Sequence, residues 1–419
     1  MSVTTRRYSR REVLRRAALL AGATDLSLAA GHPIGLMPAR ASAGPMDRLV
    51  AAHLDFGFRL YRALGTATPP SQNLFISPLS VALALSMACN GAQGATRTAI
   101  AYTLGVGALP VGDLNAASST LLAHLRTLDA AVTLSVADAL WLRQGYTVLP
   151  AFGQALRRFY DADATTLDFG DPSAPDVINA WVNRQTHGLI PSIVTRIPPH
   201  MLLYLINTLY FKAPWAEPFQ PAATRPGPFT RPDGSVRTLP MMTHTGAYRY
   251  TKGPAYEAIS LPYAAGKVAM YIILPAAPSG LSSVPGSLDA AGWAALLPSL
   301  TMEMGTLVLP RFAVTYDVRL NAALSALGMG VAFDPQRADL SAMVRPRGER
   351  AYISAVQHRT VLRVAEQGTL AAAATSIGVG TTALPVSRFT MTVNRPFFCA
   401  IRDETTGSLL FMGAIADPR

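Results

Sequence analysis

Side chains that could carry out catalysis or bind a metal are scattered along the chain and form no recognised motif. The sequence contains no His-Glu-x-x-His pair, no Gly-x-Ser-x-Gly nucleophile elbow and no glycine-rich phosphate loop, and its two cysteines lack zinc-binding spacing. A catalytic triad of residues distant in sequence stays possible, because triads are defined by their geometry. The pattern therefore disfavours an enzyme, leaves an exported hydrolase as one alternative, and indicates no metal or other cofactor.

One segment stands out for its small side chains, EQGTLAAAATS at residues 366–376. Alanine has the highest helix propensity, yet the four alanines lead into TSIGVGTTALP, whose β-branched residues, glycines and proline disfavour a helix. By composition alone, the run could be a flexible surface loop in an alanine-rich chain. What it does depends on the elements that surround it.

Three helices are predicted from apolar periodicity and capping residues. The first begins with Ser77 as N-cap and Pro78 in the first turn, and Asn90-Gly91 ends it. It is apolar on every side, so we expect it to be buried. The second covers 174–188 with Asp176 as N-cap, and the third covers 316–330.

Apolar runs rich in β-branched and aromatic residues predict the strands. They lie at 202–211, 255–263, 267–275, 305–312, 397–401 and 407–415. Because helices and strands are mixed without the regular alternation of a parallel α/β sheet, the expected fold class is α+β. Since no linker, repeat or composition shift follows residue 44, we expect one domain over 44–419.

The positive charge is concentrated at the N-terminus. Residues 1–43 hold seven arginines and two acidic residues, which supply +5 of the net +11 and leave +6 for the rest (11 − 5). SRREVLR at 9–15 is a twin-arginine pattern, followed by the apolar AALLAGA and by ASA at 41–43 as a cleavage site. We expect residues 1–43 to be a twin-arginine-type signal peptide and the protein to be exported to the periplasm, cell surface or medium. A disordered basic tail is the alternative.

Two classes of partner are not expected. No basic stripe is interleaved with aromatic residues, which disfavours nucleic-acid binding, and no apolar run is long enough to span a membrane. Cys89 and Cys399 each lie among apolar neighbours, so we expect two separate buried thiols. A disulfide is the alternative in an exported protein.

A series of short motifs runs the length of the chain. It comprises N-x-x-x-S-P-x-S (73–80), GAQGAT (91–96), INAWVNRQTHGLI (178–190), INTLYFKAPWAEPF (206–219), LPY (261–263), ILP (273–275), LPRF (309–312), ADLSAM (338–343), NRPFF (394–398) and LLFMGAIADP (409–418). Each motif is weak alone. Together, and in this order, they resemble the serpins, a family of serine protease inhibitors, over roughly residues 45–419. The resemblance implies three β-sheets, eight or nine helices and an exposed reactive loop at about 366–390.

The alanine-rich segment matches the hinge of the serpin reactive loop. The hinge residues would be Glu366, Gly368, Thr369, Ala371, Ala372, Ala373, Ala374 and Thr375. In serpins a protease cuts the loop, and the hinge then inserts into the main sheet as an added strand. Small side chains suit insertion, because bulky or charged ones would be obstructed in a close-packed interior. The resemblance thus implies an irreversible suicide-substrate inhibitor that traps the acyl-enzyme.

The bond that a target protease would cut is estimated by counting from the hinge. The usual family distance, fourteen residues after Gly368 (382 − 368), gives Thr382–Ala383, with Ala383–Leu384 as the next candidate. Proline at 385 disfavours the following bond, because proline after the scissile bond hinders most serine proteases. The small, uncharged residues favour an elastase-like or subtilisin-like target.

Two further groups of residues match serpin sites. Ser77, Ser80, Asn207 and His358 match the shutter, a polar cluster that rearranges when the main sheet opens. Trp215, Arg311 and Glu366 match the breach, where the loop first enters, with the two charged residues as an ion pair. The alternatives are an ordinary buried histidine, a core tryptophan and solvated charges.

The resemblance also predicts the partner. We expect a monomer that forms a covalent acyl complex with a serine protease. A serpin-fold binding protein without inhibitory activity is the alternative.

Overall fold

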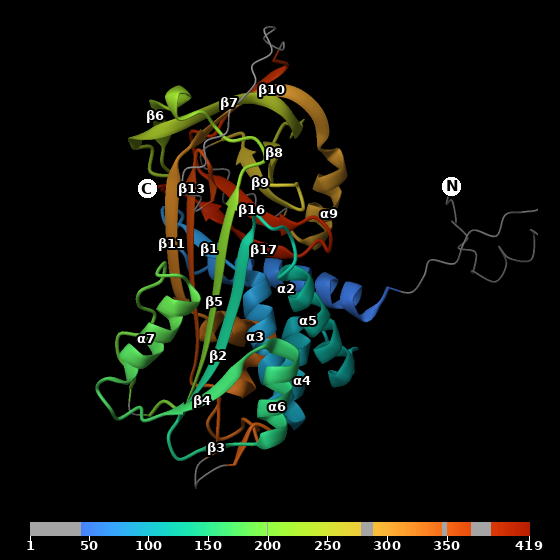
Figure 1. The fold of residues 1–419 in the computed structure, drawn as a ribbon, viewed down its shortest axis with the longest axis vertical. Helices are drawn as coiled ribbons and strands as arrows, with labels where there is room; N and C mark the ends of the chain where they lie inside the picture. The colour runs from blue at the N-terminus through green and yellow to red at the C-terminus, as the bar shows by residue number, and fades with distance from the viewer. Residues whose placement is uncertain (1–42, 199, 278–287, 346–349, 370–386) are drawn as a thin grey trace, which may run out of the picture. The chain divides into compact units, whose positions relative to one another are not determined.

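The main sheet of the computed structural model has six strands in the order β11-β13-β14-β5-β2-β4 (Figure 1). The structure describes residues 43–198, 200–277, 288–345, 350–369 and 387–419. The strand bounds are β2 (Thr133–Arg143), β4 (Asp163–Leu167), β5 (Leu203–Pro214), β11 (Phe312–Arg319), β13 (Ala355–Ala365) and β14 (Gly368–Thr369). Strands β5 and β13 run parallel to each other, whereas β2 is antiparallel to β5.

Two further sheets complete the described β-structure. The larger has nine strands in the order β1-β17-β16-β9-β8-β7-β10-β15, with β6 paired to β7. Its strands are β1 (Leu74–Ile76), β6 (Arg225–Thr230), β7 (Val236–Lys252), β8 (Tyr256–Tyr263), β9 (Val268–Pro275), β10 (Thr301–Pro310), β15 (Phe389–Thr392), β16 (Phe397–Asp403) and β17 (Leu409–Ile415). The third sheet joins β3 (Thr147–Val148) to β12 (Val344–Arg345).

Eight α-helices lie in the described part of the chain. They are α2 (Pro45–Gly65), α3 (Pro78–Gly91), α4 (Gly94–Leu104), α5 (Val111–Leu125), α6 (Pro150–Tyr160), α7 (Ala174–Gln185), α9 (Ala290–Ser299) and α10 (Asn321–Leu324). Helix α3 is buried along almost its whole length and contacts β2, β5 and β17. Its start matches the prediction, since the Ser77 side chain accepts a hydrogen bond from the Ser80 amide.

The two faces of the main sheet carry different apolar clusters because strand side chains alternate. Leu140 of β2 and Leu205 of β5 belong to the large core that includes α3. Trp141 and Ile206, one residue further on, pack instead with α7 in a smaller cluster. The main sheet is therefore buried on both faces in its middle, and any strand added to it must fit between two packed layers.

The α+β class and the predicted strands are confirmed, but two helix predictions need correction. The second helix begins at Ala174 with Ser173 before it, so Asp176 is not its N-cap and lies in the first turn. Residues 316–319 belong to β11, where each pairs with β13, and only Asn321–Leu324 are α-helical. Pairing along a full strand outweighs the local helical pattern there, and Gly328 at φ +109° interrupts the helix soon after.

Candidate functional site

The main sheet has a junction between β5 and β13 that is filled in two different ways. Residues Ala355–Arg359 of β13 pair directly with 204–208 of β5. Further along, β14 lies between them, with Gly368 opposite both Ala365 and Pro214, and Thr369 opposite Val364 and Ala213. Gly368 and Thr369, the third and fourth residues of the alanine-rich segment, therefore already occupy the position of an added central strand.

Gly368 fits this position because it has no side chain. Its φ is +144°, and a Cβ atom there would lie 2.2 Å from the carbonyl oxygen of Ala213. Thr369 is also enclosed, with its hydroxyl 2.6 Å from that of Tyr263. Burial raises the pKa of Tyr263 well above its usual range, so this phenol keeps its proton. The hinge is thus held by backbone pairing and one buried hydroxyl pair.

The turn that precedes β14 is held by Trp215, which follows β5. The Trp215 indole Nε1 donates to the carbonyl of Ala365 at 2.9 Å, and its backbone N donates to that of Gln367 at 3.0 Å. The indole stacks on Tyr263 with ring centroids 4.3 Å apart. Trp215 is therefore buried, as expected of a core tryptophan. It is also hydrogen-bonded to the residues between β13 and β14.

Arg311 and Glu366 form an ion pair at the same turn. The Glu366 side chain is 8% exposed, and it also accepts a hydrogen bond from the Thr224 hydroxyl at 2.8 Å. Burial opposes ionisation of Glu366, but the hydrogen bonds from Arg311, its own backbone and Thr224 outweigh it and lower the pKa. The carboxylate is therefore charged at neutral pH and ties β11 to the hinge.

Ser77, Ser80, Asn207 and His358 meet in one buried cluster beneath the junction of β5 and β13. The Asn207 Oδ1 accepts from the Ser80 hydroxyl and from His358 Nδ1, each at 2.7 Å. His358 Nε2 accepts from the Ser77 amide at 3.0 Å, which places the imidazole proton on Nδ1. Burial lowers the pKa of His358 to about 3, so the ring is neutral.

Asp138 belongs to this network although the sequence analysis did not select it. The Asn207 amide nitrogen donates to Asp138 Oδ1 across the β2–β5 ladder. Burial raises the pKa of Asp138 to about 8, and the bond from Asn207 opposes that shift. An acidic residue on the inward face of an alternating strand was the signal that could have identified it.

Some of the other predicted residues do not belong to these groups, and others lie outside the described part of the chain. Cys89 and Cys399 are both buried and free, as expected. Ala371–Ala374, Thr375 and the predicted reactive bond Thr382–Ala383 lie outside the described residues, as do residues 1–42 of the predicted signal peptide. Where the structure describes the chain, it shows no side-chain cluster suited to a metal ion and no helix long and apolar enough to cross a membrane.

A family model described as "Serpin (serine protease inhibitor)" matches residues 51–418. The chain belongs to the serpin family. It is 33% identical to an uncharacterised serpin-like protein of Thermococcus kodakarensis, covering 90% of this chain and 87% of the relative. Corticosteroid-binding globulin of Oryctolagus cuniculus is 31% identical, with coverage of 89% and 97%. Leukocyte elastase inhibitor A of Mus musculus is 30% identical, with coverage of 89% and 100%.

The fold agrees with solved serpins. The crystal structure of the thermophilic serpin tengpin in its native state superposes with a TM-score of 0.82 at 29% identity, covering 88% of this chain and 94% of tengpin. The family is one of serine protease inhibitors, but it also contains proteins named for hormone binding. Family membership therefore supports protease inhibition in general and leaves this serpin's target open.

Proposed function

We infer that this serpin is an irreversible suicide-substrate inhibitor of a serine protease, which it traps as a covalent acyl complex. The observation that carries the proposal is the position of Gly368 and Thr369 between β13 and β5. A loop that continues from this point has its first residues in register with the strands that must receive the rest. The alanines at 371–374 then meet no steric or desolvation obstacle to further insertion.

The energy available from insertion is sufficient for trapping. About fifteen residues at ~3.3 Å each would carry the cut end roughly 50 Å. Pairing on both sides adds on the order of twenty hydrogen bonds, each with a net value of ~0.5–1.5 kcal/mol. That sum is comparable to the stability of a typical protease domain, about 5–15 kcal/mol. A tethered protease can therefore be deformed before its acyl bond hydrolyses.

The target specificity follows from the loop sequence. Thr382–Ala383 is the proposed reactive bond, with Ala383–Leu384 next, and these residues fit an elastase-like or subtilisin-like protease. The similarity to leukocyte elastase inhibitor A supports the same class. Sequencing the peptide released from the protease reaction locates the cut directly.

Incubation with an elastase-like protease tests the function. We expect a covalent band on denaturing gels at the summed mass of the protease and the large serpin fragment, and the inhibitor works as a monomer. The alternative, a binding protein without inhibitory activity, is favoured by the similarity to corticosteroid-binding globulin. It predicts loop cleavage or no reaction, without a covalent band and without a gain in thermal stability after cleavage.

The site of action is proposed from the N-terminus. The twin-arginine pattern at 9–15, the apolar stretch and the small residues at 41–43 support export through a folded-protein pathway. The inhibitor would then meet its protease in the periplasm, at the cell surface or in the medium.

A further inference from the structure

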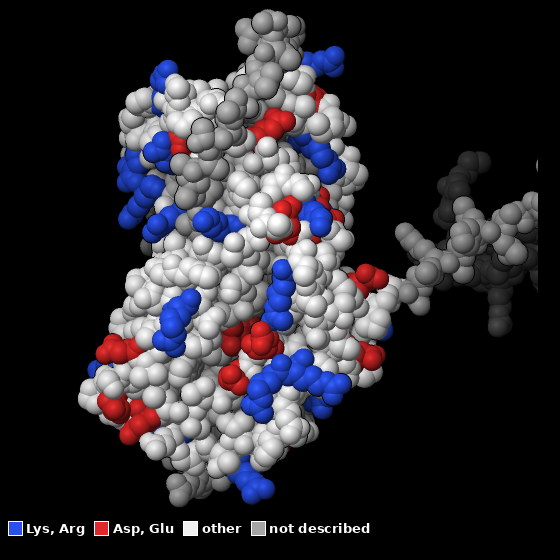
Figure 2. Space-filling view, viewed as in Figure 1, with Lys and Arg blue, Asp and Glu red and all other residues white. Residues whose placement is uncertain are grey.

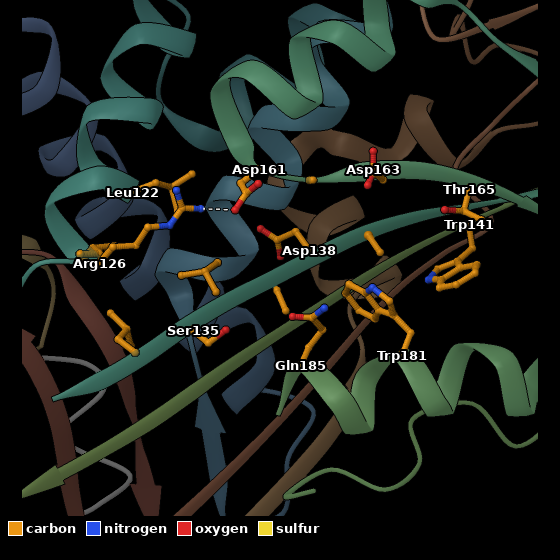
Figure 3. A pocket seen from close by; sticks show the side chains of 16 residues that line it. Leu122, Arg126, Ser135, Asp138, Trp141, Asp161, Asp163, Thr165, Trp181 and Gln185 are labelled. Atoms are coloured by element: carbon orange, nitrogen blue, oxygen red, sulfur yellow. Dashed lines mark hydrogen bonds and ion pairs between the residues drawn. The ribbon is translucent and has the colours of Figure 1, made fainter. Parts of the chain in front are cut away.

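A cavity of about 470 Å³ lies at the edge of the main sheet, away from the hinge (Figure 3). Its walls come from the end of α5, from β2, from the segment 161–165 and from α7. Six consecutive residues of β2, 134–139, line it. We call this space the β2-edge cavity. It shares no residue with the breach group and meets the buried network around Asn207 only through Asp138.

The cavity exists because, over about half of its length, β2 has a neighbouring strand on only one side. Strand β4 pairs with β2 from Ala139 to Arg143. Residues 134–138 pair with β5 on the other side, and no strand in the described part of the chain pairs with their free edge. Such an edge presents backbone N–H and C=O groups that can pair with an added strand. At ~3.3 Å per residue the free edge is roughly 16 Å long.

The two faces of this edge differ in chemistry. Asp138 projects from β2 toward Arg126 and Asp161, on the same side as Leu122 of α5 (Figure 3). Leu122 and Leu125 are apolar residues of the cavity lining. Arg126 is already paired with Asp161 at 2.7 Å. Asp138 has a hydrogen-bond partner, Asn207, but no cationic partner among the described residues. This face of the cavity therefore has an apolar lining around one carboxyl group that lacks a counter-ion.

The other face carries two tryptophans. Trp141 and Trp181 pack edge to face with ring centroids 6.1 Å apart, on the side of β2 opposite Asp138 (Figure 3). Trp141 is 5% exposed, and its indole Nε1 is buried without a hydrogen-bond acceptor. The tryptophans therefore give this face of the cavity an aromatic, apolar lining.

Acidic side chains also gather around the cavity. A space-filling view shows them over β2 near α6, with basic side chains around them (Figure 2). Asp163 is one of the residues that line the cavity, and its nearest cation, on Arg157, is 3.7 Å away with both side chains exposed. The weak pairing of Asp163 leaves the cavity attractive to a cation.

We propose that the β2-edge cavity binds an extended peptide of another protein, which adds a strand to β2 and directs a lysine or arginine side chain to Asp138. A peptide strand supplies all three features that the cavity lacks. Its backbone pairs with the free edge, its alternating side chains reach both faces, and its cation neutralises the carboxylate.

The peptide would act on the same network that holds the shutter. Asp138 accepts from the Asn207 amide nitrogen, whose oxygen accepts from Ser80 and His358. An effect of the peptide on loop insertion rests on the proposed function, whereas its binding does not. A serpin that binds the peptide but traps no protease would refute the proposed function and leave the binding site intact.

Isothermal titration calorimetry of the full chain with the pentapeptide Ac-Leu-Thr-Arg-Thr-Leu-NH2 tests the proposal. We expect binding at pH 9, at least about tenfold weaker binding when norleucine replaces arginine, and none when alternate amides are N-methylated. Asp138→Asn should weaken binding of the arginine peptide to the level of the norleucine peptide. Asp176→Asn, an exposed change on α7, is the matched control and should bind like wild type.

The wild-type protein supplies a second measurement should Asp138→Asn fold poorly. Burial raises the pKa of Asp138 to about 8, so a cationic peptide should bind more weakly at pH 6, where the carboxyl is protonated. The titratable and charged groups facing it are Arg126 of the α5 end, Asp161 and Asp163 beside β4, and His358 through Asn207. Absence of binding, equal affinity for the arginine and norleucine peptides, or equal affinity for the N-methylated peptide would overturn the proposal.

Discussion

The hydroxyl oxygens of Thr369 and Tyr263 lie 2.6 Å apart in a buried contact between the main sheet and the second sheet. This contact joins the hinge to β8 of the second sheet, and Thr369 is 1% exposed. In this structure β5 and β13 are thus already separated beside Thr369, and β14 lies between them. Under the proposed mechanism, further insertion extends β14 and must then separate residues Ala355–Arg359 of β13 from residues 204–208 of β5. The contacts around β14 are therefore the first targets for mutation.

Tyr263→Phe should destabilise the native state by about 1–3 kcal/mol, because the buried Thr369 hydroxyl loses its partner. Urea unfolding of the intact protein measures the change. Thr369→Val on the Tyr263→Phe background should recover part of the loss, since the unpaired hydroxyl is then absent. If the double variant were less stable than Tyr263→Phe by a further ~1–3 kcal/mol, the loss of the hydroxyl pair would not explain the destabilisation.

Gly368→Ala should displace the hinge from the sheet, because the new Cβ would meet the Ala213 carbonyl oxygen at 2.2 Å. We expect a loss of stability of about 1–3 kcal/mol and a larger fraction of serpin cleaved without trapping, since the same residue must sit in the completed strand. Gly112→Ala is the control, because a Cβ there has open space. Equal behaviour of the two variants would contradict the role given to Gly368.

Ala373→Pro and Ala372→Glu should convert the inhibitor into a substrate. Proline removes a ladder hydrogen bond from a central strand, and a glutamate brings a charge into a packed interior. The stoichiometry of inhibition on denaturing gels should rise severalfold while the loop is still cut. Trapping at the wild-type ratio by both variants would mean that this segment does not enter the sheet.

Acid should weaken the native state between about pH 6.5 and about pH 3. Burial lowers the pKa of His53 and of His358 to about 3, whereas unfolded imidazoles titrate near 6.5. In this window the unfolded chain binds more protons, so the free energy of unfolding falls as pH falls. Between pH 7 and pH 5, the free energy of unfolding of His358→Gln should therefore fall by on the order of 2 kcal/mol less than that of the wild type.

The measurement is denaturant unfolding of both proteins at the two pH values. Asp138 acts in the opposite direction, because its raised pKa makes stability fall as pH rises from about 4 toward about 8. The difference between variant and wild type cancels this contribution. An equal pH response in the two proteins would show that His358 does not resist protonation in the native state.

Replacing Arg10 and Arg11 with lysine should leave the protein in the cytoplasm, because the twin-arginine signal is read by its receptor as a sequence address. Cell fractionation with immunodetection measures the result. The control replaces Arg15 and Arg16 with lysine, so that both variants keep the positive charge and differ only in which arginines are changed. Unchanged secretion of the Arg10–Arg11 variant would refute the twin-arginine assignment.

Residue types and their order were sufficient for much of the fold and for selecting residues that the structure brings together around Asn207 and around Glu366. Ser77 and Pro78 start α3 as predicted because capping depends on neighbouring residues. The apolar runs became strands for the same local reason. Residues 316–319 departed from their helical pattern because β13, far along the chain, pairs with them.

The sequence by itself determined that this chain is a serpin with a hinge of small residues, since composition and motif order are properties of the chain alone. Only the tertiary structure decided that Thr369 already lies between β13 and β5, that Asp138 supports Asn207, and that β2 keeps a free edge. These facts depend on which strands end where and on which side chains meet across the sheet. Asn207 and Asp138 are 69 positions apart, and Thr369 and Tyr263 are 106 positions apart, so no local pattern encodes these contacts.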